Sequence, residues 1–212
     1  NPVDARRKGD YLYWADANKG DLSRSTLAGA YTSWNVKGVI GFYGTAVDDD
    51  GRLWAGVLSG HDIYRLDPSG TICTYTLPDA GLMSGYMVFQ DGYLWFGDDY
   101  NARLLRLRIS DDQLEWWGDL PVDSSLFGMV LDGQGDLWYA DTNNASLAEL
   151  APDLKQLTIY SLPAGSLPAM LAMQGRLVWY TQFNLGPTYD YRAGMGSLDP
   201  DVASHTHLAL SY

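Results

Sequence analysis

Three observations predict that this chain has an all-β fold of the β-propeller class. A short segment built on a leucine followed by an aromatic or large apolar residue occurs five times. Successive copies are separated by 41, 41, 43 and 40 residues, and a fixed period in this range is typical of propeller blades of four strands each. The eight Trp and 15 Tyr residues suit flat β-sheet surfaces. The repeated leucines are Leu12, Leu53, Leu94, Leu137 and Leu177.

The second repeat shows why each period is expected to contain four strands. Short runs of apolar or alternating residues are separated by turn signals. Asp50-Gly51 favours a tight hairpin, because this pair tolerates the positive φ angles that such a turn requires. The segment 67–70, Asp-Pro-Ser-Gly, is a second turn in which proline presets φ. The four strands are expected over residues 43–47, 52–57, 62–66 and 72–77.

A single domain is expected over residues 1–212, because the repeats fill the whole chain. The segment 1–8, where the first repeat should have its innermost strand, is short and charged. The last repeat is expected to end with its own fourth strand over residues 207–210, after an insertion over roughly residues 183–194. The chain therefore holds either five four-stranded blades that close directly or a five-blade portion of a larger propeller. The repeats run approximately over residues 1–42, 43–84, 85–125, 126–167 and 168–212.

The composition indicates a folded domain and disfavours two kinds of partner. Hydrophobic residues make up 46% of the chain, which is enough to build a large core. The net charge of −12 repels phosphate backbones and anionic lipid surfaces, so nucleic-acid binding is not expected. No apolar run is long enough to cross a bilayer, so membrane insertion is not expected.

Cysteine usage and the first residue bear on the compartment. Cys73 is the only cysteine, so no intrachain disulfide forms, and its strand-like surroundings predict a buried, inert thiol. The chain begins at Asn1 without an initiator methionine, which is expected of a processed or excised form. An extracellular or periplasmic location is the expectation that follows.

Polar residues recur just after the second strand of several repeats. Asp16, Asp98 and Asp141 lie four residues after their leucine, and Asn101 and Asn144 lie seven residues after theirs. Because a propeller brings equivalent positions together around its axis, these side chains could line one face. Carboxylate and amide oxygens are the ligands of Mg²⁺ and Ca²⁺, so a metal site is one reading. The other is local: Asp and Asn side chains bond their own backbone and shape turns.

The repeats resemble two related kinds of propeller. The third repeat, with Gly92-Tyr93-Leu94-Trp95-Phe96 followed by Asn101 and Arg106-Leu107, is similar to virginiamycin B lyases, also called streptogramin lyases. The first repeat, with Leu12-Tyr13-Trp14-Ala15-Asp16 followed by Leu22-Ser23-Arg24, is similar to YWTD repeats of lipoprotein receptors. Both belong to a loose group that includes NHL and gluconolactonase propellers.

The resemblance implies a fold for the whole chain and two chemistries. Its lyase branch implies a Mg²⁺-assisted elimination that uses His and Glu near the central channel, and its gluconolactonase branch implies a metal held by Asp, Asn and Glu. This sequence departs from the lyase pattern after Trp-Phe, where Gly97-Asp98 replaces Thr-Glu. The two glutamates, Glu115 and Glu149, are expected on a fourth and a third strand, away from the channel.

Histidines offer two further candidates. His61 follows Gly60 in the loop between a second and a third strand, from which it could reach a face of the propeller as a catalytic residue. His205 and His207 have the spacing that places both rings on one face of a strand, which suits a metal. That strand is expected to be the outermost of its blade, and this favours a solvated rim.

Aromatic residues divide into core and contact candidates. Trp54, Trp95 and Trp138 share one position in the repeat, which predicts packing between blades. Trp116 and Trp117 are neighbours on a strand, so one of the two rings must point outward. Together with Phe127, this pair is the expected contact surface for a partner.

These observations predict a non-catalytic binding or scaffolding module outside the cytoplasm, with a protein, a small molecule or a glycan as its ligand. The alternative is a metal-assisted enzyme of the streptogramin-lyase or lactonase kind that uses Mg²⁺ or Ca²⁺. Binding of a divalent cation on the propeller axis would separate the two.

Overall fold

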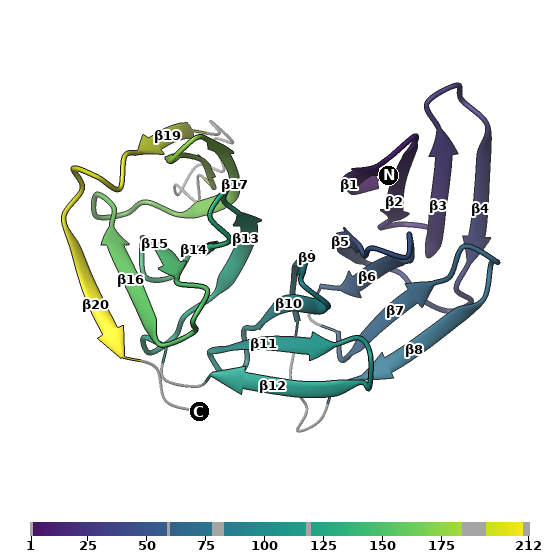
Figure 1. Ribbon diagram of the computed structural model, residues 1–212, viewed down its shortest axis with the longest axis horizontal. Helices are drawn as coiled ribbons and strands as arrows, with labels where there is room; N and C mark the ends of the chain where they lie inside the picture. Colours follow the sequence, from purple (N-terminus) through teal and green to yellow (C-terminus); the bar gives the residue numbers. More distant parts are fainter. Residues whose placement is uncertain (1, 59, 78–82, 118–119, 184–193, 210–212) are drawn as a thin grey trace. The chain divides into compact units, whose positions relative to one another are not determined.

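The computed structural model describes residues 1–212 except 1, 59, 78–82, 118–119, 184–193 and 210–212, and every regular element within the described residues is a β-strand (Figure 1). Among these residues, no helix is long and apolar enough to span a membrane. The strands form five antiparallel sheets. The chain divides into two compact units, residues 1–101 with 105–115, and residues 102–104 with 116–212.

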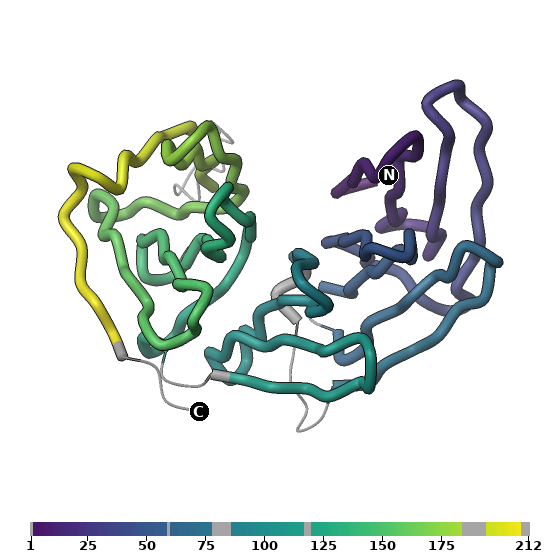
Figure 2. The backbone as a smooth tube through the Cα atoms, viewed as in Figure 1, coloured from purple at the N-terminus to yellow at the C-terminus, as the bar shows by residue number. Residues whose placement is uncertain are grey.

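The first unit contains two sheets and most of a third, and each is a meander in which consecutive strands pair (Figure 2). The first sheet consists of β1 (Pro2–Lys8), β2 (Tyr11–Asp16), β3 (Asp21–Thr26) and β4 (Tyr31–Asn35). The second consists of β5 (Phe42–Val47), β6 (Leu53–Val57), β7 (Asp62–Leu66) and β8 (Ile72–Thr76). The third consists of β9 (Met83–Gln90), β10 (Tyr93–Asp98), β11 (Arg103–Arg108) and β12 (Gln113–Trp117).

The second unit contains the fourth and fifth sheets. The fourth consists of β13 (Leu126–Leu131), β14 (Leu137–Asp141), β15 (Ser146–Leu150), β16 (Gln156–Ser161) and β20 (His205–Ala209). The fifth consists of β17 (Pro168–Gln174), β18 (Leu177–Gln182) and β19 (Gly194–Leu198). The second strand of every repeat thus carries or adjoins the repeated leucine, as the period predicts.

The position of β20 corrects the expectation that the last repeat supplies its own fourth strand. β20 pairs antiparallel with β16 of the fourth sheet, with Thr158 opposite His207. The physical reason is that an alternating pattern specifies a strand but not its partner. Here β20 covers the outer edge of β16, whose backbone groups would otherwise be unpaired. Within the described residues, the fourth sheet has five strands and the fifth has three.

The charged segment at the start of the chain does form the innermost strand of the first sheet. Asp4 accepts hydrogen bonds from the backbone N–H and the hydroxyl of Thr45, at 2.9 and 3.1 Å. Arg6 donates from Nε to the carbonyl oxygen of Thr45 at 2.9 Å. The charges of β1 are therefore used to bind the backbone of β5, the innermost strand of the next sheet.

The core of each unit lies between neighbouring sheets. Trp54 and Phe96, from the second and third sheets, belong to one buried cluster, and Trp138 and Tyr180, from the fourth and fifth sheets, belong to another. Trp54, Trp95 and Trp138 are 0%, 5% and 0% exposed. The clusters that contain Trp54 and Trp138 confirm the packing between sheets predicted for this position, and for Trp95 such packing stays a prediction. Sheets approach closely where Gly128 on β13 faces the backbone of β17, because a Cβ there would collide with the carbonyl of Ala169.

Candidate functional site

The recurring aspartates each hold the loop that follows their strand. In the first unit, Oδ1 of Asp98 accepts the N–H groups of Tyr100 and Asn101 at 3.1 and 3.2 Å, and Oδ2 accepts from Nδ2 of Asn101 at 2.8 Å. Asp16 accepts the N–H groups of Asn18 and Lys19 at 2.9 and 3.1 Å. These bonds fit the local reading, in which the side chains shape turns.

The equivalent carboxylate of the second unit bonds Asn144 in the loop after its strand and also bonds the segment before β13. Asp141 is 1% exposed and accepts hydrogen bonds from the backbone of Ser125 at 3.1 Å and from the hydroxyl of Ser124 at 2.6 Å. Nδ2 of Asn144 donates to its Oδ2 at 2.9 Å. A metal ligated by Asp16, Asp98, Asn101, Asp141 and Asn144 stays a prediction.

The candidate catalytic histidine and the candidate contact residues lie on different strands and loops. His61 is exposed in the β6–β7 loop. Trp116 on β12 is 48% exposed, and the guanidinium of Arg103 lies 5.6 Å from its ring centroid. The side chain of Trp117 lies outside the described residues. Phe127 on β13 is half-buried and meets Phe183 edge-on, with ring centroids 4.9 Å apart. The insertion of the last repeat falls largely in residues 184–193, which are also outside the described part.

His205 and His207 share one face of β20, as their spacing predicts. Their ring centroids are 4.8 Å apart. Nδ1 of His207 lies 3.0 Å from the hydroxyl of Thr158, and the ring of His205 lies 5.5 Å from that of Tyr160. Both side chains are exposed, consistent with a solvated rim.

A cluster of three acids in the second unit was not predicted from the sequence. Asp132 and Asp136 lie in the β13–β14 turn, and Glu149 lies on β15. Each offers one carboxylate oxygen, and these oxygens all lie within 4.8 Å of one another. Asp132 builds the turn, because its Oδ1 accepts the N–H groups of Gln134 and Asp136 at 2.7 and 3.0 Å. These three residues are called the acidic cluster below.

Arg176, from the β17–β18 turn of the fifth sheet, is the cation of this cluster. Its guanidinium lies 3.5 Å from Asp132, 3.9 Å from Asp136 and 3.2 Å from Glu149, and Nε lies 3.5 Å from Asp201. Its side chain is 34% exposed. A pocket of about 510 Å³ opens beside the turn, between Asp132 and Arg176.

The cluster holds more negative charge than Arg176 neutralises. Burial raises the pKa of the Asp136 carboxyl to about 6, with the carboxylates of Asp132 and Glu149 adding to the effect and Arg176 opposing it. Glu149 also accepts a hydrogen bond of 2.6 Å from the hydroxyl of Tyr160. Burial, followed by this bond, raises the pKa of the Tyr160 hydroxyl well above its ordinary value. The tyrosine therefore remains a neutral donor.

The second and fourth repeats use the same turn differently. Asp48 and Asp132 both lie five residues before their leucine. In the second repeat, Oδ2 of Asp48 accepts from Nε of Arg52 at 2.6 Å and from Nε1 of Trp54 at 2.8 Å. In the fourth repeat, Asp136 stands where Arg52 stands. Among the described residues, Oδ2 of Asp132 and Nε1 of Trp138 then have no hydrogen-bond partner.

Glu149, the third acid of the cluster, also stands where other repeats have arginine. The residue twelve positions after the repeated leucine is arginine in the first three repeats. These guanidinium groups lie over aromatic rings, as with Arg106, which is 4.0 Å from the ring centroid of Tyr93. The fourth repeat has Glu149 at this position. Aligning the repeats would have revealed both replacements, so the sequence did carry a signal for the cluster. The three arginines are Arg24, Arg65 and Arg106.

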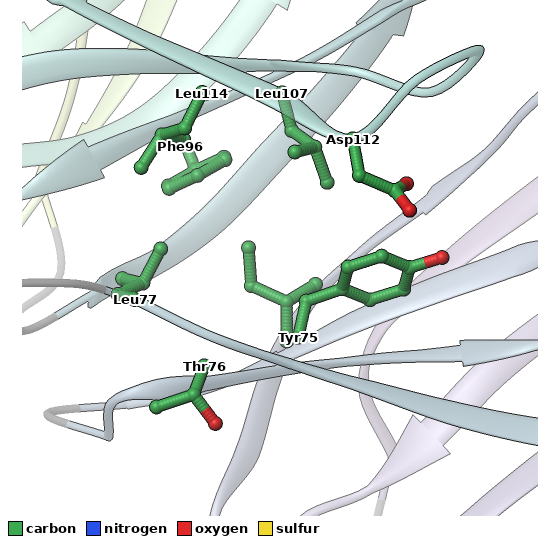
Figure 3. Close-up of a pocket in the computed structure, with 8 residues that line it drawn as sticks. Tyr75, Thr76, Leu77, Phe96, Leu107, Asp112 and Leu114 are labelled. Atoms are coloured by element: carbon green, nitrogen blue, oxygen red, sulfur yellow. The ribbon is translucent and has the colours of Figure 1, made fainter.

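An apolar pocket of about 250 Å³ lies between the second and third sheets of the first unit (Figure 3). Leu77 reaches into it from the end of β8, and Phe96, Leu107 and Leu114 face it from the third sheet. Polar atoms are found at its rim, from Tyr75, Thr76 and Asp112. The phenol of Tyr75 is itself fixed by Nη1 of Arg65 at 2.5 Å.

Known proteins share the fold of this chain but little of its sequence. No protein-family model and no curated protein sequence matches it. A catalytically inactive virginiamycin B lyase from Staphylococcus aureus, crystallised with quinupristin, superposes with a TM-score of 0.76 at 16% identity, over 92% of this chain and 69% of the other. The chain has a β-propeller fold similar to that of virginiamycin B lyase. This confirms the fold class and the first resemblance.

Two further structures widen the comparison. A chain of a nidogen/laminin complex matches with a TM-score of 0.71 at 16% identity, over 93% of this chain and 74% of the other. The extracellular domain of a protein assigned as a one component system in B. thetaiotaomicron matches with a TM-score of 0.70 at 14% identity, over 98% of this chain and 30% of the other. At these identities the likeness shows the fold alone.

Proposed function

We propose that this chain is a non-catalytic binding module of the β-propeller type, and that the pocket between its second and third sheets receives an apolar group of the ligand. The pocket is the observation that carries the proposal. Its walls are apolar side chains of two neighbouring sheets, and its few polar groups lie at the rim (Figure 3). Ligand sites commonly combine an apolar cavity with a small number of polar groups that fix orientation.

The rim indicates what the rest of the ligand should carry. Asp112 is exposed at the edge of the pocket and brings a carboxylate to it. A ligand with a hydrogen-bond donor or a positive charge beside its apolar group would satisfy both features. A peptide segment of a protein partner and a small molecule both meet this description.

Two observations support a binding role over catalysis and a location outside the cytoplasm. The carboxylates of Asp98 and Asp141 are already bonded to loop N–H groups, which supports a structural use of these residues. One similar structure is an extracellular domain, and another belongs to a complex between nidogen and laminin. These likenesses favour an extracytoplasmic module that contacts another molecule.

Binding of the neutral fluorophore Nile red tests the pocket. We expect saturable binding to the folded chain, and loss of most of it in Leu114→Trp, which fills the space. Leu27→Trp makes the same change at a side chain that is 52% exposed in the turn between β3 and β4, and should bind the dye as the parent does. Equal binding by parent and Leu114→Trp would count against the pocket as a ligand site.

The second candidate function is a metal-assisted enzyme of the lyase or lactonase kind, favoured by the similarity to virginiamycin B lyase. Incubation of the chain with quinupristin and Mg²⁺, followed by mass spectrometry, tests it. Our proposal expects unchanged quinupristin. Turnover that is lost in both Asp98→Asn and Asp141→Asn would replace the binding role with an enzymatic one.

A further inference from the structure

The acidic cluster has the donor geometry of a cation site. Its three carboxylates come from a turn and an adjacent strand of one sheet, so the backbone fixes their positions. The oxygens that they offer lie within 4.8 Å of one another. That spread does not exceed twice a Ca²⁺–oxygen distance of about 2.4 Å, so one ion can reach all three.

The acidic cluster contains a buried carboxylate oxygen that accepts no hydrogen bond from the described residues. The Asp132 side chain is 1% exposed, and its Oδ2 has no hydrogen-bond partner among the described residues. The nearest cation, Nη1 of Arg176, is 3.5 Å away, which is long for a charge-assisted hydrogen bond. In the second repeat, the equivalent oxygen of Asp48 has two donors. Because a buried carboxylate oxygen without a hydrogen-bond donor is unfavourable, this oxygen would be stabilised by a cation that binds it more closely than Arg176 does.

The net negative charge of the acidic cluster also favours binding of a cation. Three acids face one arginine, and Asp201 adds a fourth carboxylate at the edge. Asp132 and Arg176 also line a pocket of about 510 Å³, which provides room for water ligands beside Asp132.

We propose that Asp132, Asp136 and Glu149 bind one divalent cation, with Ca²⁺ preferred to Mg²⁺, and that Arg176 occupies the site in its absence. Arg176 is one-third exposed and comes from a neighbouring sheet, so it can leave without unfolding the turn. Ca²⁺ accepts an irregular set of six to eight oxygens, whereas Mg²⁺ demands a smaller octahedron. This inference is independent of the apolar pocket and of the proposed binding role.

Calorimetric titration of the full chain, stripped of metal with EGTA, tests the proposal. We expect one saturable Ca²⁺ site and weaker binding of Mg²⁺. Asp136→Asn should weaken Ca²⁺ binding by about tenfold or more, because affinity follows the charge of the ligands. Asp153→Asn removes a carboxylate from an exposed turn of the same unit and should bind Ca²⁺ as the parent does. Asp136 is chosen over Asp132, whose Oδ1 builds the turn.

Arg176→Gln separates a cation site from an ion-pair network that exists only to hold the arginine. If Arg176 competes with the ion, this variant should bind Ca²⁺ more tightly than the parent, and Ca²⁺ should raise its Tm by more. Absence of a saturable Ca²⁺ signal from both the parent and Arg176→Gln would overturn the proposal. Unchanged affinity in Asp136→Asn would overturn the assignment of the ligands, and equal or tighter binding of Mg²⁺ would overturn the stated preference.

Discussion

Nη2 of Arg176 lies 3.2 Å from Oε1 of Glu149, so an arginine of the fifth sheet pairs with an acid of the fourth. In the second repeat, the equivalent Arg52 instead pairs with Asp48 of its own turn, at 2.6 Å. The arginine just before the repeated leucine therefore forms an ion pair within one sheet at Arg52 and an ion pair between two sheets at Arg176. Asp136 and Glu149 stand where other repeats have arginine, and both form ion pairs with Arg176 of the fifth sheet.

Removal of Arg176 should destabilise the second unit in a pH-dependent way. Arg176→Met leaves three buried or half-buried acids without their cation, and we expect a loss of about 1–3 kcal/mol in the free energy of unfolding at pH 7. The loss should shrink at pH 5, because Asp136 is then largely protonated. Urea denaturation at both pH values measures this, with Arg108→Met, which breaks an exposed pair with Asp111, as the control.

Asp136 should make the protein more stable in mild acid. Its pKa is about 6 in the folded chain against an ordinary value of 3.8, so the folded state binds more protons between these values. Stability from this group is therefore present below about pH 4 and lost as the pH rises through about 6. Asp136→Asn should remove this dependence and raise the free energy of unfolding at pH 7 by about 2 kcal/mol. A variant less stable than the parent at pH 7, without added cations, would contradict the pKa assignment.

Two of the three buried tryptophans at the same repeat position, Trp54 and Trp138, should respond differently to loss of the indole N–H. Nε1 of Trp54 donates to Asp48 at 2.8 Å, whereas Nε1 of Trp138 has no partner among the described residues. Both substitutions to Phe remove similar volume, so their difference reports the hydrogen bond. We expect Trp54→Phe to cost about 1.5–3 kcal/mol more than Trp138→Phe, the value of a bond to a charged group. Thermal and urea unfolding of the two variants measures the difference.

Asp98 distinguishes turn formation from metal binding. Its carboxylate is fully buried and accepts bonds from Tyr100 and from Asn101. Asp98→Ala should therefore lower the free energy of unfolding by about 1–3 kcal/mol in the presence of EDTA. Asp98→Asn keeps an acceptor oxygen and should lose less. A stability loss that appears only when Mg²⁺ or Ca²⁺ is present would instead favour the metal reading of this position.

The strand β20 should protect the edge of the fourth sheet. Deleting residues 204–212 removes the partner of β16 and exposes its backbone groups. We expect lower stability and concentration-dependent association, detected by light scattering during mild heating. His207→Ala in the full chain leaves the backbone pairing intact and should remain monodisperse. If the truncated chain matched the full chain in stability and in light scattering, β20 would not be needed to protect the β16 edge.

Much of the fold could be predicted from local patterns. The repeated leucine segment marks the second strand of each repeat, and the Asp50-Gly51 pair marks a hairpin in which Gly51 has φ of +75°. The burial of Trp54, Trp95 and Trp138 also followed from their shared position. These features recur with the repeat because each blade packs against its neighbours through equivalent positions.

The acidic cluster was harder to find because Asp136 and Glu149 replace arginines of other repeats, and because Glu149 lies on a different element from the two aspartates. Asp132 lies in a turn and Glu149 on a strand, and neither position by itself indicates a shared site. Only the pairing of β14 with β15, and the approach of the β17–β18 turn, bring them to Arg176. Departures from the repeat pattern mark this cluster, whereas the pattern itself does not.

The sequence by itself determined the all-β class, the blade period and the residues that pack between sheets, because these depend on the order of apolar and turn-forming residues along the chain. The tertiary structure alone decided that β20 joins the fourth sheet, that Arg176 serves an acid of its neighbour, and that two leucine-rich sheet faces leave a pocket between them. The reason is physical: backbone edges, buried charges and cavities are properties of surfaces that meet, and their partners are chosen only when the chain has folded.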